Sequence, residues 1–167
     1  MKRVISLLAL VFSVSLIGCK KQAKTNKVPK VRKSTSKPVK ARPRAVVLKP
    51  TPSPAGAKVF IVSPKDGATV KSPFEVKFGI SGMTVAPAGV KKPNTGHHHL
   101  LIDMDKLPDL TKPLPKSKQL IHFGKGQTST KLTLKPGKHT LQLLLADYRH
   151  LPHKPAVFSK KITITVK

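Results

Sequence analysis

Apolar and polar residues alternate in short runs along the C-terminal two thirds of the chain. In the clearest run, residues 73–80, Phe74, Val76, Phe78 and Ile80 alternate with charged or small residues. Successive side chains of a strand point to opposite faces, so this period of two predicts a half-buried β-strand. Similar runs occupy residues 58–63, 97–104, 129–134, 138–147 and 157–166. Residues 58–167 show no helical period, which predicts an all-β, antiparallel, immunoglobulin-like β-sandwich of about seven strands.

The histidines are confined to this predicted domain, and none of the seven precedes residue 97. In such a sandwich the third strand runs antiparallel to the penultimate one. We expect the penultimate strand, residues 138–147, to form a hairpin with residues 129–134. This topology brings six histidines to one end of the domain, namely His97, His98, His99, His122, His150 and His153. Only His139 is expected at the other end.

The gathered imidazoles predict a transition-metal site. His97 and His99 share one face of their strand, about 7 Å apart, while His98 shares the apolar face with Leu100 and Ile102. Imidazole is a ligand for copper, zinc and nickel, and with Met83 in reach the set favours copper, with zinc as the alternative. The expected ligands are His97, His99, His122, His150 and His153, with His98, Asp147 and Met83 as additional candidates.

Other interpretations of these residues stay open at this stage. Loop histidines also serve as hydrogen-bonding residues that fix irregular segments, and the pair His150 and Asp147 fits that role; binding of another ligand is a third alternative. The segment from Gly124 to Thr128 lacks the first glycine of a phosphate-binding loop, although amides beside Lys125 suit a bound anion. No serine stands in a nucleophile elbow, so we expect a binding protein and not an enzyme.

The first 18 residues have the pattern of a bacterial lipoprotein signal peptide. Lys2 and Arg3 precede an apolar run that is too short for a membrane span, and Leu16-Ile17-Gly18-Cys19 resembles a lipobox. The single cysteine, Cys19, is the expected site of acylation, palmitate included. Lys20 follows in place of an aspartate, which favours the outer membrane, facing the periplasm. An ordinary signal peptide or an uncleaved anchor is the alternative.

Residues 19–57 form a predicted lipid-anchored tether. Lysine, arginine and proline dominate this stretch, which contains no acidic residue, and its apolar residues follow no period. Such a chain cannot bury a core and remains extended and disordered. The whole chain carries a formal net charge of +27, which favours contact with anionic cell-wall or outer-membrane polymers. We therefore keep a non-catalytic adhesion or scaffold role, through residues 20–57, as the alternative function to metal binding. A plain solvated tether is the other interpretation of this segment.

Nucleic acid is not an expected partner. The chain has no tryptophan, and Tyr148 is its only tyrosine, so a basic surface lacks the aromatic side chains on which bases stack.

Several motifs resemble an uncharacterised family of secreted bacterial proteins, the domain-of-unknown-function 4399 family. They are the segment 61–67, the run from Gly96 to Asp103, the segment 122–128, the segment 137–143, the His150-Leu151-Pro152-His153 loop and the final strand. The resemblance covers residues 58–167 and implies a small extracytoplasmic domain with no established activity. Ala146 departs from the glycine that the resemblance leads us to expect before Asp147.

Overall fold

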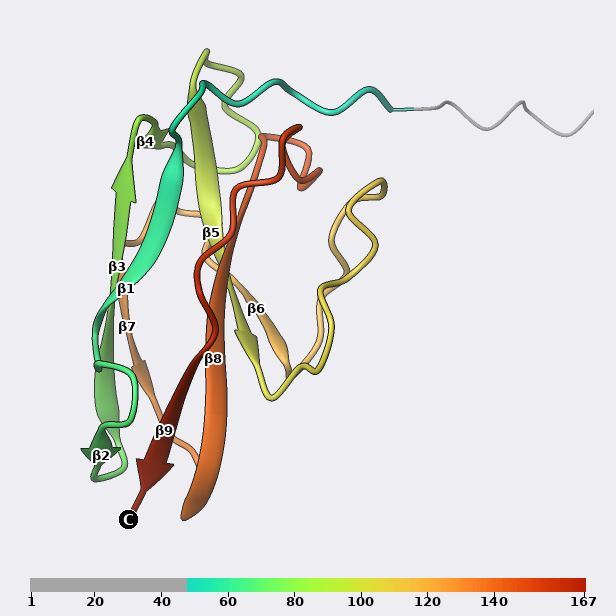
Figure 1. The fold of residues 1–167 in the computed structure, drawn as a ribbon. Coiled ribbons are helices and arrows are strands. Elements are labelled where there is room, and N and C mark those ends of the chain that lie inside the picture. The colour runs from blue at the N-terminus through green and yellow to red at the C-terminus, as the bar shows by residue number, and fades with distance from the viewer. Residues whose placement is uncertain (1–47) are drawn as a thin grey trace, which may run out of the picture. The chain divides into compact units, whose positions relative to one another are not determined.

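A computed structural model describes residues 48–167 of the chain (Figure 1). The predicted signal peptide, Cys19 and residues 20–47 lie outside the described residues. The described strands are β1 (Lys58–Ser63), β2 (Thr69–Val70), β3 (Phe74–Ser81), β4 (Thr84–Val85), β5 (Thr95–Ile102), β6 (Leu120–His122), β7 (Ser129–Leu132), β8 (Gly137–Ala146) and β9 (Ile162–Val166). Within residues 48–167 no helix is long and apolar enough to cross a bilayer.

The strands form two sheets, which confirms the predicted all-β sandwich. The smaller sheet has the order β1-β3-β7, and the larger has the order β2-β9-β8-β5-β4, with β6 also paired to β5. Most pairings are antiparallel, but the two-residue strands β2 and β4 pair in parallel with β9 and β5. The predicted pairing of the third strand with the penultimate one is confirmed, since β5 lies antiparallel to β8.

The predicted hairpin between residues 129–134 and 138–147 is wrong. Strand β7 pairs with β3 in the other sheet, in the register Phe74↔Leu132 and Lys77↔Ser129. The chain therefore crosses between the sheets at the turn before β8. Strand β8 pairs with β9 instead, and the short β6 pairs with β5, with His99 opposite His122. His122 thus still reaches the histidine strand, by a route other than the one predicted.

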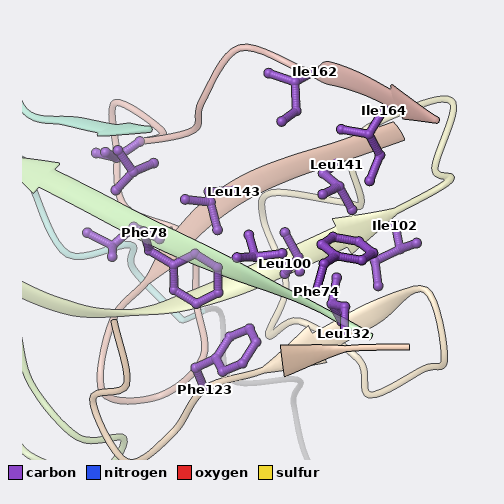
Figure 2. Close-up of a cluster of buried hydrophobic side chains, with 14 of the residues drawn as sticks. Phe74, Phe78, Leu100, Ile102, Phe123, Leu132, Leu141, Leu143, Ile162 and Ile164 are labelled. Atoms are coloured by element: carbon purple, nitrogen blue, oxygen red, sulfur yellow. The ribbon is translucent and has the colours of Figure 1, made fainter. Parts of the chain in front are cut away.

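The main core lies between the two sheets (Figure 2). Phe74, Val76 and Phe78 of β3 are buried and point towards β5 and β8, while Glu75 and Lys77 are exposed, as the alternation predicts. The larger sheet supplies Leu100, Ile102, Leu141, Leu143, Ile162 and Ile164. Each fully buried side chain of this size stabilises the fold by about 1.5–3 kcal/mol.

The outer face of the larger sheet is covered as well. A second cluster joins Leu101 and Leu144 of the sheet to Leu114 of the long connection that follows β5 and to Leu120 of β6. In Figure 1 this connection, in yellow and tan, stands on the side of β5 and β8 that faces away from β1, β3 and β7. Every residue of β5 is consequently buried, including three consecutive histidines.

Residues 48–57, which the sequence places in the tether, belong to the folded unit. The Thr51 hydroxyl donates a hydrogen bond of 2.6 Å to the Asp147 carboxylate, and Pro52 bridges to Lys154. The Ser53 hydroxyl donates to the Pro155 carbonyl at 2.7 Å. The packed part of the chain therefore begins before the first predicted strand, and its first residues lie against the loop that carries His150.

Candidate metal centre

Two paired strands and one loop bring four imidazoles together. Strand β5 presents His97 and His99 on its outer face, and the pairing of β6 with β5 sets His122 opposite His99. The ring centroids of His97, His122 and His150 form a nearly equilateral triangle with sides of 4.7–4.9 Å. The ring of His99 lies 4.8 Å from that of His97 and 5.1 Å from that of His122.

The turn after β8 places His150, and Asp147 organises that turn. The Asp147 carboxylate accepts hydrogen bonds from the backbone amides of Arg149 (2.8 Å) and Leu151 (3.1 Å). His150 donates its amide to the Asp147 carbonyl and takes a φ of +67°, a left-handed conformation that is uncommon outside glycine. These bonds turn the chain so that the His150 ring reaches the outer face of β5.

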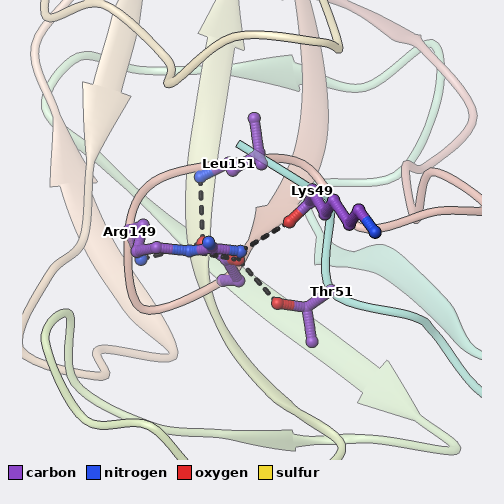
Figure 3. A network of polar contacts seen from close by, with 5 residues as sticks. Lys49, Thr51, Arg149 and Leu151 are labelled. Carbon is purple, nitrogen blue, oxygen red and sulfur yellow. Dashed lines mark hydrogen bonds and ion pairs between the residues drawn. The ribbon is translucent and has the colours of Figure 1, made fainter. Parts of the chain in front are cut away.

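The Asp147 carboxylate also binds the segment before β1, through Thr51, which Figure 3 shows beside Arg149 and Lys49. It accepts bonds from the Thr51 hydroxyl and from the Arg149 guanidinium, whose other contact is the Lys49 carbonyl at 2.7 Å. Burial raises the pKa of Asp147, but the bonds from Thr51 and Arg149 outweigh it and hold that pKa below its usual value. Asp147 is therefore a buried carboxylate with its own partners, and its link to His150 runs through the backbone, from the His150 amide to the Asp147 carbonyl.

Three of the histidines can hold one metal ion. One ring nitrogen from each of His97, His122 and His150 lies within 4.8 Å of the others, and the Nε2 atoms of His122 and His150 are 3.1 Å apart. Two nitrogens on a tetrahedral ion with bonds of about 2.0–2.1 Å stand roughly 3.3 Å apart, so the third must approach by at most roughly 1.5 Å. No carboxylate of the described residues joins the group.

One hydrogen bond lies within the cluster, between the Nε2 atoms of His122 and His150 at 3.1 Å, but other ring nitrogens lack the partners that a structural role would require. Neither ring nitrogen of His97, nor Nδ1 of His99, has a hydrogen-bond partner within residues 48–167, although both side chains are buried. An unpaired buried polar group costs about 1–3 kcal/mol. A metal ion bound among these converging imidazoles would give the unpaired ring nitrogens a partner.

Burial keeps the imidazoles of His97 and His99 neutral. Burial, followed by the nearby rings of His122 and His150, lowers the pKa of His97 to about 3. Burial and the same neighbours lower the pKa of His99 to about 2, and burial lowers that of His122. A metal ligand must be unprotonated, so these side chains are ready to bind a cation at neutral pH without releasing a proton.

His98 faces the other way, as the sequence predicts for the core-facing member of the run. Its ring packs against Phe78, with centroids 5.2 Å apart, and neither nitrogen has a partner in the described part of the chain. Burial lowers its pKa to about 4. His98 is on the opposite face of the sheet from the coordinating group.

His153 does not join the group of His97, His122 and His150. It is buried against the start of β5, and burial lowers its pKa. A Cβ atom at Gly96 would lie 2.9 Å from His153 Nε2 and 2.7 Å from the Ala146 carbonyl oxygen. Gly96 therefore allows the His153 ring and β8 to approach β5 closely, and Ala146 is itself fully buried there.

The remaining candidates lie apart from the cluster. Met83 belongs to the core between the sheets. The Lys125 amide donates to Gln127 Oε1 and the Gly126 amide to the Phe123 carbonyl, so neither of these amides is free for an anion. His139 is at the opposite end of β8, as predicted, where its hydrogen bond to Asp103 raises its pKa.

Sequence reasoning missed the residues that shape the site. A Cβ atom at Gly124 would overlap the ring of His122, so any larger residue there would displace that ring from its position in the cluster. Leu114, from the long connection, donates its amide to the His150 carbonyl at 2.9 Å. Together with Pro113, Pro115 and Lys116, it lines an open cavity of about 160 Å³ beside His99, His122 and His150. These residues follow no period, so only the fold shows their place.

Comparison with known proteins identifies the family but no function. No curated protein and no solved structure matches the chain. The model of the family described as Domain of unknown function (DUF4399) matches residues 76–167, which is more than half of the 167 residues and includes all seven histidines. Because this match covers more than half of the chain, the chain belongs to the DUF4399 family.

Proposed function

We propose that this protein binds a transition-metal ion, copper above all, through His97, His122 and His150. The observation that carries the proposal is the convergence of three imidazoles from β5, β6 and the loop after β8, with ring nitrogens within 4.8 Å of one another. The buried, unpartnered nitrogens of His97 support it. Nitrogen sites of this kind bind Cu²⁺ more tightly than Zn²⁺, and the order of affinities favours copper.

The choice of copper rests on the imidazoles alone. Met83, which on sequence grounds favours copper, is buried in the core between the sheets, so a soft sulfur ligand adds no support. Zinc is the alternative ion, because three histidines with a fourth position for another ligand also suit Zn²⁺.

Loss of one ligand should abolish tight binding. We expect His122→Ala and His150→Ala each to lower the Cu(II) affinity of the purified protein by more than about 100-fold. Even the loss of a residue that only hydrogen-bonds to a metal ligand lowers metal affinity by about 10–100-fold. Both side chains are only partly buried, so these changes should leave the fold intact. Isothermal titration calorimetry with Cu(II) and with Zn(II) measures the effect. His139→Ala, which removes a histidine at the other end of β8, is the matched control and should bind as the unmodified protein does.

Millimolar binding, or equal affinity in all three variants, would contradict the proposal. Electron paramagnetic resonance of the Cu(II)-loaded protein supplies a second readout, because coupling to imidazole nitrogens should weaken in His122→Ala and in His150→Ala but not in His139→Ala.

For its location we propose an extracytoplasmic lipoprotein, acylated at Cys19 and held at the outer membrane. The support is the signal-like pattern of residues 1–18 and the position of the only cysteine. Cys19→Ala should move the protein from the membrane fraction to the soluble fraction of lysed cells, and retention in the membrane would argue for an uncleaved anchor.

A second function is favoured by a separate surface: binding of anionic wall or outer-membrane polymers. A cleft of about 470 Å³ is lined by Lys49, Lys91, Lys92 and Arg149, and its one acidic residue, Asp147, is buried and paired with Arg149. Lys49 is the last basic residue of the acid-free stretch, residues 20–57. Clefts lined by one sign of charge concentrate ligands of the opposite sign.

The charge of this cleft is directly testable. The double variant Lys91→Glu, Lys92→Glu should release the protein from lipopolysaccharide vesicles or peptidoglycan in a co-sedimentation assay. Added salt should likewise weaken the binding of the unmodified protein to these polymers. Lys131→Glu, Lys138→Glu makes an equal charge change on exposed strand residues elsewhere. Equal loss in both double variants would show an effect of net charge and not of the cleft.

A further inference from the structure

We infer that a metal ion held by His97, His122 and His150 takes a small monoanion as an additional ligand, in the cavity beside the cluster. This inference rests on the proposed metal site and extends it from holding an ion to presenting that ion to a second molecule. The chemical class is an anion of roughly three or four heavy atoms, such as azide, formate or hydrogencarbonate, limited by the size of the cavity.

The cavity lies on one side of the coordinating group. It has a volume of about 160 Å³ and is lined by His122 and His150 of the group, by His99, and by residues 113–116. His97 does not line it and is fully buried in β5. An ion among the three rings would therefore have protein on the His97 side and the cavity on the other. Three histidine ligands leave a four-coordinate ion, tetragonal for Cu²⁺ or tetrahedral for Zn²⁺, with its fourth position for a ligand from outside the chain.

The charges of the site select an anion. All three ligands are neutral imidazoles, and no carboxylate of residues 48–167 belongs to the group, so a divalent ion keeps both of its charges. The buried carboxylate of Asp147 is taken by Thr51 and Arg149. Lys116 adds a further positive charge to the cavity wall. A partly buried, uncompensated dication is costly, and a bound anion removes much of that cost.

His99 supplies a hydrogen-bonding group at the same place. Its ring lines the cavity and lies within 5.1 Å of the His122 ring, yet it is not in the coordinating group. Its Nδ1 atom has no partner among the described residues. A neutral imidazole carries one N–H donor, which suits an anion bound to the neighbouring ion. His99 is thus assigned a positioning role towards the second ligand.

Titration of the Cu(II)-loaded protein with sodium azide tests the inference. Azide bound to Cu(II) gives a charge-transfer absorption band and changes the electron paramagnetic resonance spectrum, so saturable binding can be followed separately from metal binding. We expect saturation in the unmodified protein, loss of the azide signal in Leu114→Trp, which fills the cavity, and an azide affinity lowered by up to about fivefold in Lys116→Gln. Lys118→Gln, a change to an exposed lysine of the same connection that does not line the cavity, should match the unmodified protein.

The outcomes separate the two proposals. Normal Cu(II) binding with no azide response, or an azide response that neither Leu114→Trp nor Lys116→Gln alters, overturns the second ligand and leaves the metal site standing. Absence of Cu(II) binding in calorimetry overturns both. Leu114 is buried in the second cluster, so if Leu114→Trp does not fold, the comparison of Lys116→Gln with Lys118→Gln decides.

Discussion

Without metal, the protein is expected to lose stability steeply as the pH falls below about 6.5. Burial lowers the pKa values of His97, His98 and His99 to about 3, 4 and 2, so the folded protein keeps these rings neutral while the unfolded chain protonates them. Their contribution is complete above the unfolded pKa and is lost progressively as the pH drops towards the folded values. Each ring can lower the free energy of unfolding by up to about 1.4 kcal/mol for every pH unit between these two pKa values.

Three such histidines together can remove up to about 4 kcal/mol of unfolding free energy per pH unit, which is a large share of a typical domain stability of about 5–15 kcal/mol. Urea unfolding of the metal-free protein at several pH values between 7.5 and 4.5 measures the slope. Added Cu(II) should shift the loss to lower pH, because an ion that binds only the folded state stabilises it. A stability that stays constant over this range would contradict the buried, neutral state of the three rings.

His98→Leu is the variant that isolates one of these contributions. His98 packs against Phe78 with both ring nitrogens unpartnered among the described residues, so leucine should add roughly 1–3 kcal/mol of stability at neutral pH. It should also flatten the acid slope by one titrating group. His139→Gln should not flatten it, because hydrogen bonding to Asp103 raises the pKa of His139, whose contribution is present below about 6.5 and lost as the pH rises.

The period of two predicted both the sandwich and the faces of its strands. In β3 the alternation of Phe74 and Val76 with Glu75 and Lys77 matches the observed burial, because one face meets the core and the other meets solvent. The same rule separated His98, on the core face, from His97 and His99 on the outer face. Pairing of the third strand with the penultimate one then accounted for the meeting of His97 with the loop that carries His150.

What alternation does not specify is the partner of a strand. Residues 129–132 alternate equally well beside β8 or β3, and the chain crosses to β3, so that β9 and not β7 pairs with β8. The connection before β6 has no period at all, yet its Leu114 covers the outer face of the sheet. His153 and Thr51 depend on the same tertiary contacts, so their places could not be read from sequence spacing.

Asp147→Ala is expected to weaken both the fold and the metal site. The carboxylate accepts bonds from the amides of Arg149 and Leu151, from the Thr51 hydroxyl and from the Arg149 guanidinium. Its loss leaves these donors unpaired and should cost roughly 2–4 kcal/mol. Because the same turn gives His150 its φ of +67°, the folded fraction should also bind Cu(II) about 10–100-fold more weakly.

Two further variants separate the turn from the segment that docks on it. Thr51→Val removes only the bond between the Asp147 carboxylate and the residues before β1, so it should lower stability by about 1 kcal/mol and leave Cu(II) affinity unchanged. Asp147→Asn keeps an oxygen for the two turn amides but loses the charge that binds Arg149, and should fall between Asp147→Ala and the unmodified protein in both measurements. If Thr51→Val weakened metal binding as much as Asp147→Ala, the docked segment and not the turn would position His150. If Cu(II) affinity instead fell in strict proportion to stability across all three variants, Asp147 would affect metal binding only by stabilising the fold.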